Sequence, residues 1–156
     1  MSSSSPPLPL RWGDAATRRW TGGWLIVGGG VSIAGSNTEA LWVLAMGTAA
    51  HVAGWCILPA AGWRRTLAVG PATLTMWLLL TGPRFVFVLV VPYLLWLLVQ
   101  HRRALSLVTA IPVAVVAVLV GNVFWHDYSG MLPALAIVGL TIVAADRLAR
   151  VLERRR

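Results

Sequence analysis

The sequence predicts an all-α integral membrane protein: a bundle of six transmembrane helices with both termini on the cytoplasmic side. Three observations predict this fold. Charged residues make up only 12% of the chain and hydrophobic residues 58%, whereas a soluble domain carries about 25% charged residues. Long apolar runs alternate with short polar segments. The arginines gather in every second polar segment, which is the asymmetry that marks the cytoplasmic side of a membrane protein.

The apolar runs divide the chain into three parts. We expect a cytoplasmic Ser-, Pro- and Arg-rich tail over residues 1–19, a six-helix transmembrane domain over 20–151 and a basic cytoplasmic tail over 152–156. The predicted spans are residues 20–34, 40–61, 66–81, 85–99, 104–124 and 131–145. The charged sequence that follows the last span is expected to continue it as a helix.

The first run is rich in glycine, which lets helices approach closely in lipid. Basic residues precede this run and Ser32-Ile33-Ala34, with small residues at its first and third positions, ends it, a pattern that also matches a cleaved secretory signal. We interpret the run as a retained first span. The second run, residues 40–61, contains no Arg, Lys, Asp or Glu, and about 22 residues of helix cover the roughly 30 Å of a hydrocarbon layer.

The third and fourth runs hold only about 16 residues each, which corresponds to roughly 23 Å of helix. Two arrangements fit such short runs. They are either short spans in a thinned bilayer, or a re-entrant hairpin whose tip, Gly82-Pro83-Arg84, stops inside the protein. We favour six full spans.

The distribution of arginine supports this layout. The chain has 13 basic residues, all of them arginine, and 12 fall on one side if the six spans alternate in direction. Only Arg84 falls on the other side. The positive-inside rule assigns the arginine-rich side to the cytoplasm. The 12 residues are Arg11, Arg18, Arg19, Arg64, Arg65, Arg102, Arg103, Arg147, Arg150, Arg154, Arg155 and Arg156.

His51, at the midpoint of the second run, is the first candidate for a functional residue. An ionisable group inside a membrane is costly to bury, and it therefore suggests a function. A neutral histidine that hydrogen-bonds to a neighbouring helix is the favoured interpretation. The alternative is a ligand to haem or another tetrapyrrole, or a proton relay. Small residues are expected to pack the first two helices; they are Gly30, Ala34, Gly47, Ala50 and Gly54.

Four further polar residues are candidates for ligand binding or proton relay. Arg84 is favoured as a simple interfacial anchor, with an anionic substrate or a lipid phosphate as the alternative ligand. Asn122 is suited to a hydrogen bond between helices. His126 and Asp127 are adjacent in a polar loop, a pair suited to binding a metal or relaying protons, although an ordinary interfacial turn is the favoured interpretation. The sequence contains no catalytic motif such as HExxH, Gly-x-Ser-x-Gly or a P-loop. We therefore predict no catalytic residue and no resident metal.

These features predict a small non-enzymatic membrane protein, a subunit or accessory component of a membrane complex. A small-solute carrier or channel with a polar path near His51, Asn122 and Arg84 is one alternative, and a haem- or pigment-binding protein is another. The expected partners are the lipid bilayer and either further copies of the chain or other membrane subunits, not nucleic acid. The composition, rich in Arg, Ala, Val and Gly, favours a bacterial inner membrane, and the nine tryptophans favour an aromatic belt at its interfaces.

Overall fold

The computed structural model describes residues 13–36, 39–100, 104–126 and 128–154. Within these ranges the chain is helical and contains no strand. Several of the residues considered above lie outside the described ranges: the tail up to Trp12, Arg102, Arg103, Asp127 and the last two arginines. The α-helices are α1 (Ala15–Ala34), α2 (Leu41–Ile57), α3 (Gly62–Leu78), α4 (Val90–Val99), α5 (Ala110–Val123) and α6 (Met131–Arg154).

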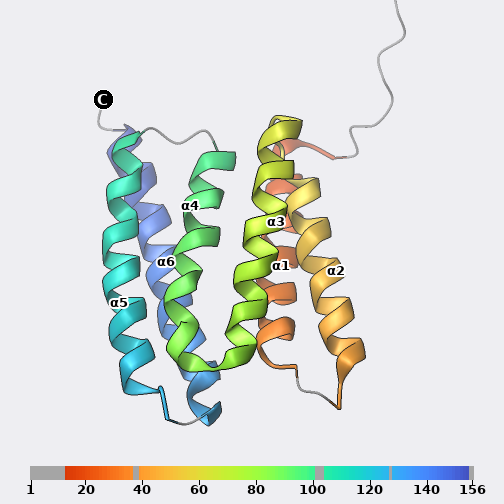
Figure 1. The fold of residues 1–156 in the computed structure, drawn as a ribbon. Coiled ribbons are helices and arrows are strands. Elements are labelled where there is room, and N and C mark those ends of the chain that lie inside the picture. Colours follow the sequence, from red (N-terminus) through yellow and green to blue (C-terminus); the bar gives the residue numbers. More distant parts are fainter. Residues whose placement is uncertain (1–12, 37–38, 101–103, 127, 155–156) are drawn as a thin grey trace, which may run out of the picture.

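The described residues thus form six α-helices, as predicted. The helices run up and down beside one another, with α1, α2 and α3 on one side of the bundle and α4, α5 and α6 on the other (Figure 1). Short 3₁₀ segments complete the rods: η1 (Leu79–Thr81), η2 (Pro83–Leu89), η3 (Ala104–Thr109) and η4 (Tyr128–Gly130).

α1 begins at Ala15, before the start predicted at Trp20, because Asp14 caps the helix. The Asp14 carboxylate accepts a hydrogen bond of 2.7 Å from the backbone N–H of Thr17. A side-chain acceptor at this position satisfies one of the backbone donors that a helix start leaves without a partner. At the other end of the chain, α6 extends through the charged sequence to Arg154.

Glycines set the distance between α1 and α2. A Cβ atom on Gly29 would lie 2.5 Å from the carbonyl oxygen of Gly47, and a Cβ atom on Gly54 would lie 2.7 Å from that of Gly22. The two glycines are seven residues apart on each helix, so both pairs meet along one seam, as a heptad spacing requires. The backbones therefore touch along this seam, which no larger residue would allow.

The predicted packing residues have different neighbours. Gly47 and Gly54 lie in the α1–α2 seam, and Ala50 between them is half-buried. Gly30 lies beside both α2 and α3, since its Cβ atom would lie 3.8 Å from His51 Nδ1 and 3.0 Å from Met76 Sδ. Ala34 is fully buried in the larger hydrophobic core.

α3 and α4 are joined by a tight turn at Gly82, which has a φ of +121°, in the region that favours glycine. With η1 and η2, the two rods extend over residues 62–81 and 83–99. Their turn lies at the same end of the bundle as the α1–α2 and α5–α6 connections (Figure 1). The turn also packs against α5, where a Cβ atom on Gly121 would lie 3.2 Å from the Arg84 carbonyl oxygen.

By length and composition, two helical stretches among the described residues are able to cross a membrane: Ala104–Val123 and Met131–Leu152. Leu41–Ile57 and Pro83–Val99 are apolar but shorter. Large apolar side chains cover the outer faces of these helices. Val123 is 73% exposed, Leu140 71% and Trp42 71%.

The described charged side chains lie mostly at one end of the bundle, which we call the arginine end. It contains the start of α1, the α2–α3 connection, the end of α4 and the end of α6 (Figure 1). Arg84 lies in the turn at the opposite end. The arginine end carries Arg18, Arg19, Arg64, Arg65, Arg147 and Arg150.

Candidate functional site

His51 lies fully buried in the middle of α2, against α1. Its Nδ1 atom is 2.9 Å from the Ile26 carbonyl oxygen, and its Nε2 atom accepts a hydrogen bond of 3.1 Å from the Trp55 indole. An indole N–H only donates and a carbonyl only accepts. These partners therefore specify a neutral imidazole whose proton is on Nδ1 and bonds Ile26 on α1.

Both ring nitrogens of His51 are thus engaged. A ligand to haem must offer one ring nitrogen to the metal, so one of the two hydrogen bonds would have to break. The backbone of α1 also passes close by, since a Cβ atom on Gly29 would lie 2.5 Å from the His51 backbone nitrogen. The geometry of His51 fits a polar link between two helices.

The other predicted site residues that the structure describes lie at the end of the bundle opposite the arginine end. Arg84 is exposed, with its guanidinium carbon 5.0 Å from the centre of the Phe85 ring. Asn122 donates its hydrogen bond to the Val118 carbonyl oxygen of its own helix, 2.8 Å away, and not to a neighbouring helix. His126 is exposed and its ring centre lies 3.8 Å from that of Trp125. Within the described part of the chain, the His51 side chain contacts Ile26 and Trp55 and none of these three residues.

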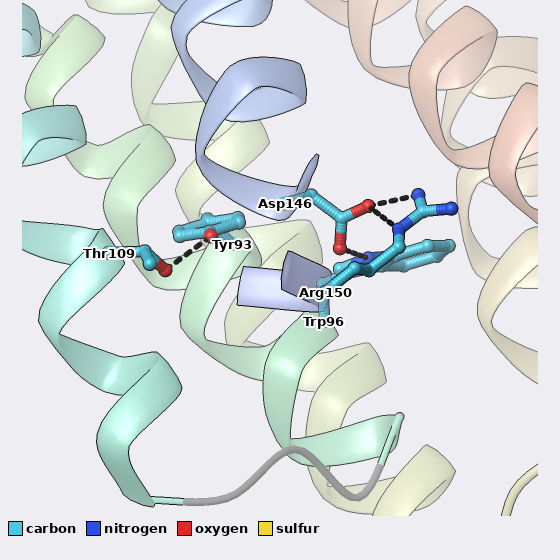
Figure 2. A network of polar contacts seen from close by, with 5 residues as sticks. All are labelled: Tyr93, Trp96, Thr109, Asp146 and Arg150. Atoms are coloured by element: carbon cyan, nitrogen blue, oxygen red, sulfur yellow. Dashed lines mark hydrogen bonds and ion pairs between the residues drawn. The ribbon is translucent and has the colours of Figure 1, made fainter. Parts of the chain in front are cut away.

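A polar cluster links α4 to α6 near the arginine end (Figure 2). Its ion pair joins Asp146 and Arg150, four residues apart on α6, as the i, i+4 spacing predicts. The contact of this pair with α4 does not follow from the sequence. Asp146 is 7% exposed, the most buried of the described acidic residues. Its Oδ1 atom accepts a hydrogen bond of 3.3 Å from the Trp96 indole, and its Oδ2 atom accepts one of 2.9 Å from Arg150 Nε. We call Trp96, Asp146 and Arg150 the Asp146 cluster.

Trp96 also faces α1. Its Cη2 atom would lie 3.7 Å from a Cβ atom on Gly23. The indole therefore reaches from α1 to the carboxylate on α6, and it connects the two sides of the bundle.

A second polar contact joins α4 to the segment that leads into α5. The hydroxyl oxygens of Tyr93 and Thr109 are 2.7 Å apart, and both side chains are buried (Figure 2). Thr109 donates its own proton to the Ser106 carbonyl oxygen at 2.6 Å. A hydroxyl has one proton to donate, so Tyr93 is the donor to Thr109.

The sequence contains a signal for the burial of Asp146 that our prediction overlooked. Val138, Ile142 and Asp146 follow one another at four-residue spacing, which places them on one face of a helix. Val138 is fully buried and Ile142 packs against the core, so the same face carries Asp146 inward. Its partner Trp96 has no such signal, because only the tertiary arrangement brings α4 to α6.

Three arginines bond carbonyl oxygens at the ends of neighbouring helices. Arg18 Nε donates to Ile57 O at 3.0 Å and Arg65 Nη1 to Cys56 O at 2.6 Å, both at the end of α2. Arg64 Nη1 donates to Leu98 O at 3.0 Å, at the end of α4. The last carbonyls of a helix have no partner within it and carry partial negative charge, so each bond supplies a missing partner and a compensating positive charge.

Among the described residues, no group of three or more His, Cys, Asp and Glu side chains is arranged to hold a metal ion. Searches against protein-family models, curated proteins and solved structures find no match to the chain. The fold and its polar contacts therefore define the class, an all-α bundle with candidate membrane-spanning helices, and any function has to be inferred from the geometry.

Proposed function

We propose that the chain is a multi-pass integral membrane protein with its arginine end in the cytoplasm, and that it acts as a non-enzymatic subunit or accessory component of a membrane complex. The observation that carries the proposal is the surface of the bundle. Apolar side chains are exposed on the outer faces of the helices, between an end rich in arginine and an end with Arg84.

The exposed apolar surface supports a lipid environment. Among the described residues, 29 large apolar side chains are exposed, and burying one such side chain is worth about 1.5–3 kcal/mol. Monomeric soluble proteins rarely expose continuous apolar patches beyond a few hundred Å². In a bilayer the same side chains contact acyl chains and carry no such cost.

The charges support one orientation. Six alternating crossings would place both termini of the chain at the same end of the bundle. Arg18, Arg64 and Arg65 lie at that end. Trp20 and Trp63 are exposed there, 69% and 61% respectively, as is usual for indoles at a membrane interface. The positive-inside rule then assigns this end to the cytoplasm.

A non-enzymatic role is supported by the uses of the buried polar groups. His51 joins α2 to α1, and Asp146 joins α6 to α4. Both groups are engaged in contacts that hold helices together. Because the connections between helices are short, such as residues 58–61, the surface available to a partner is formed mainly by the helix faces. Another membrane protein or a further copy of this chain fits such a surface.

Single-cysteine labelling tests the orientation. Cys56 is the only cysteine, so Cys56→Ser provides a background for Ala61→Cys at the arginine end and Arg84→Cys at the opposite end, two exposed positions. In intact cells, an impermeant maleimide is expected to label Arg84→Cys, and to label Ala61→Cys only after permeabilisation. Equal labelling of both in intact cells, or recovery of the protein in the soluble fraction, would contradict the proposed membrane layout.

Co-purification tests the subunit role separately. The chain, extracted in a mild detergent, is expected to elute with a stoichiometric membrane partner or as a homo-oligomer. A membrane-bound protein that elutes as a monomer without a partner, both with and without prior chemical cross-linking, would contradict this role and leave the membrane layout standing.

A further inference from the structure

A small pocket opens at the arginine end, where α1 meets the ends of α2 and α4. It has a volume of about 90 Å³, well above the roughly 10–15 Å³ that one water molecule needs by the same measure, and is large enough for a phosphate group. Leu58 and Val99 are almost fully buried and form its apolar floor. Pro59 and Gln100 also line it, and the exposed Arg19 lies at its rim.

The ends of α2 and α4 would by themselves repel an anion, because the last carbonyls of a helix carry partial negative charge. Here three guanidinium groups compensate that charge. Arg18 and Arg65 bond carbonyls of α2, and Arg64 bonds a carbonyl of α4. The pocket therefore lies between two helix ends whose negative charge is already compensated, in a region of positive charge.

Arg19 is used differently from these three arginines. Among the described residues, its guanidinium group has no hydrogen-bond or ion-pair partner. It is close enough to Asp14 to contribute slightly to that residue's lowered pKa, yet it forms no ion pair with it. The donors of Arg19 are thus available at the rim of the pocket, and a guanidinium presents paired donors that fit the oxygens of a phosphate.

We propose that this pocket binds the phosphate group of an anionic phospholipid, with Arg19 as its main donor. The inference rests on the proposed membrane location, since that location puts the arginine end at the level of the lipid headgroups. Basic pockets between transmembrane helices on the cytoplasmic side commonly bind such headgroups. The faces of the helices below the arginine end carry exposed apolar side chains, so the acyl chains would lie outside the pocket, along these faces.

Native mass spectrometry of the full chain in a neutral detergent tests the proposal. Dioleoyl-phosphatidylglycerol is titrated in parallel with dioleoyl-phosphatidylcholine. The wild type is expected to bind one phosphatidylglycerol in preference to phosphatidylcholine. Arg19→Gln should weaken that binding about tenfold, the effect expected for loss of a charge-assisted hydrogen bond. Arg19→Lys, which keeps the charge but not the paired donors, should give an intermediate loss.

Arg147→Gln is the matched control. Arg147 is also an exposed arginine of the arginine end and does not line the pocket. The Arg147→Gln variant should bind phosphatidylglycerol with an affinity within about twofold of the wild type, because solvent and salt screen the interaction of a distant exposed charge with the lipid. If Arg19→Gln and Arg147→Gln lose affinity equally, or if neither does, the proposal is overturned.

Inorganic phosphate separates a lipid headgroup from a soluble ligand. If it displaces phosphatidylglycerol from the wild type at an equal concentration, the assignment to a lipid is overturned. The cysteine labelling separates this inference from the proposed function. If the protein is membrane-bound and oriented as proposed but Arg19→Gln binds lipid like the wild type, only the headgroup site fails. If the protein is not membrane-bound, the proposed function fails with it.

Discussion

Gly29 and Gly47 face each other across the α1–α2 seam so closely that a Cβ atom on Gly29 would lie 2.5 Å from the Gly47 carbonyl oxygen. The same added atom would lie 2.9 Å from the His51 Cα atom. Both neighbours are backbone atoms, which cannot move aside as a side chain can. The seam therefore depends on the absence of a side chain at Gly29.

We expect Gly29→Ala to destabilise the bundle by about 1–3 kcal/mol, as is usual when atoms are added to a closely packed interior. Gly28→Ala is the control, since a Cβ atom there meets nothing within 4 Å. It should be neutral, or stabilising by up to about 1 kcal/mol through helix propensity. Equilibrium unfolding in mixed micelles followed by circular dichroism measures both. Equal stabilities of the two variants would show that the seam is looser than described.

His51→Leu should cost about 1–3 kcal/mol of unfolding free energy, because it leaves the buried Trp55 indole N–H without an acceptor. Adding Trp55→Phe removes that unpaired donor. The double variant should therefore lose less than the sum of the two single variants. His126→Leu, at an exposed position, should change the stability by less than about 0.5 kcal/mol. Additive losses at His51 and Trp55 would contradict the hydrogen bond between them.

The two changes Asp146→Ala and Asp146→Asn should differ in effect. Asparagine keeps an oxygen that accepts the Trp96 hydrogen bond, whereas alanine leaves the indole without this partner, at a cost of about 1–3 kcal/mol. Arg150→Gln should cost only about 0–1 kcal/mol, because the Arg150 side chain is 55% exposed and solvent weakens the ion pair. Thermal unfolding of the three variants tests this order. A larger loss for Arg150→Gln than for Asp146→Ala would contradict it.

The start of α1 should depend on pH through Asp14. Its side-chain and backbone hydrogen bonds with Thr17 lower the pKa of the carboxyl below its ordinary value of 3.8. A lowered pKa in the folded state means that the carboxylate stabilises the cap above pH 3.8, and that this contribution is lost as the pH falls through the lower folded value. Amide exchange at Thr17, corrected for intrinsic rates, should accelerate in that acidic range.

Asp14→Asn is the control for this pH effect, because an asparagine oxygen caps the helix but does not titrate. Protection of the Thr17 amide in this variant should not change over the same range. If Asp14→Asn lost protection in parallel with the wild type, the pH dependence would have to come from another group.

The sequence was sufficient to predict the number of helices and their approximate positions. Glycine, proline and paired arginines interrupt the apolar runs, for example at Gly82 and Pro83 and at Arg64 and Arg65. Gly82 and Pro83 separate α3 from α4 for local reasons, so tertiary contacts are not needed to place that boundary. Arg64 and Arg65 lie in the first turn of α3 and mark a helix start only approximately. Asp14 is a local signal of the same kind, an acidic residue directly before a helix, and reading it would have placed the start of α1 correctly.

The contacts between helices were harder to predict from the sequence. Gly22 and Gly29 are spaced like Gly47 and Gly54, and this match predicts a common seam, but the predicted packing residues on α1 were Gly30 and Ala34 and did not include Gly22 or Gly29. The partners of Asp146 could not be predicted, because Trp96 is 50 residues away in sequence. The interpretation of His51 as a hydrogen-bonded histidine required only one nearby acceptor, and Ile26 supplies it on the adjacent helix.

The seam between α1 and α2 bears on the order in which the chain assembles. The Ile26–His51 and Arg18–Ile57 hydrogen bonds and both glycine pairs all close before residue 58. These contacts between α1 and α2 therefore need no residue from the later helices. If the chain is inserted into a membrane as proposed, we expect the first two helices to pair with each other before the later helices join them.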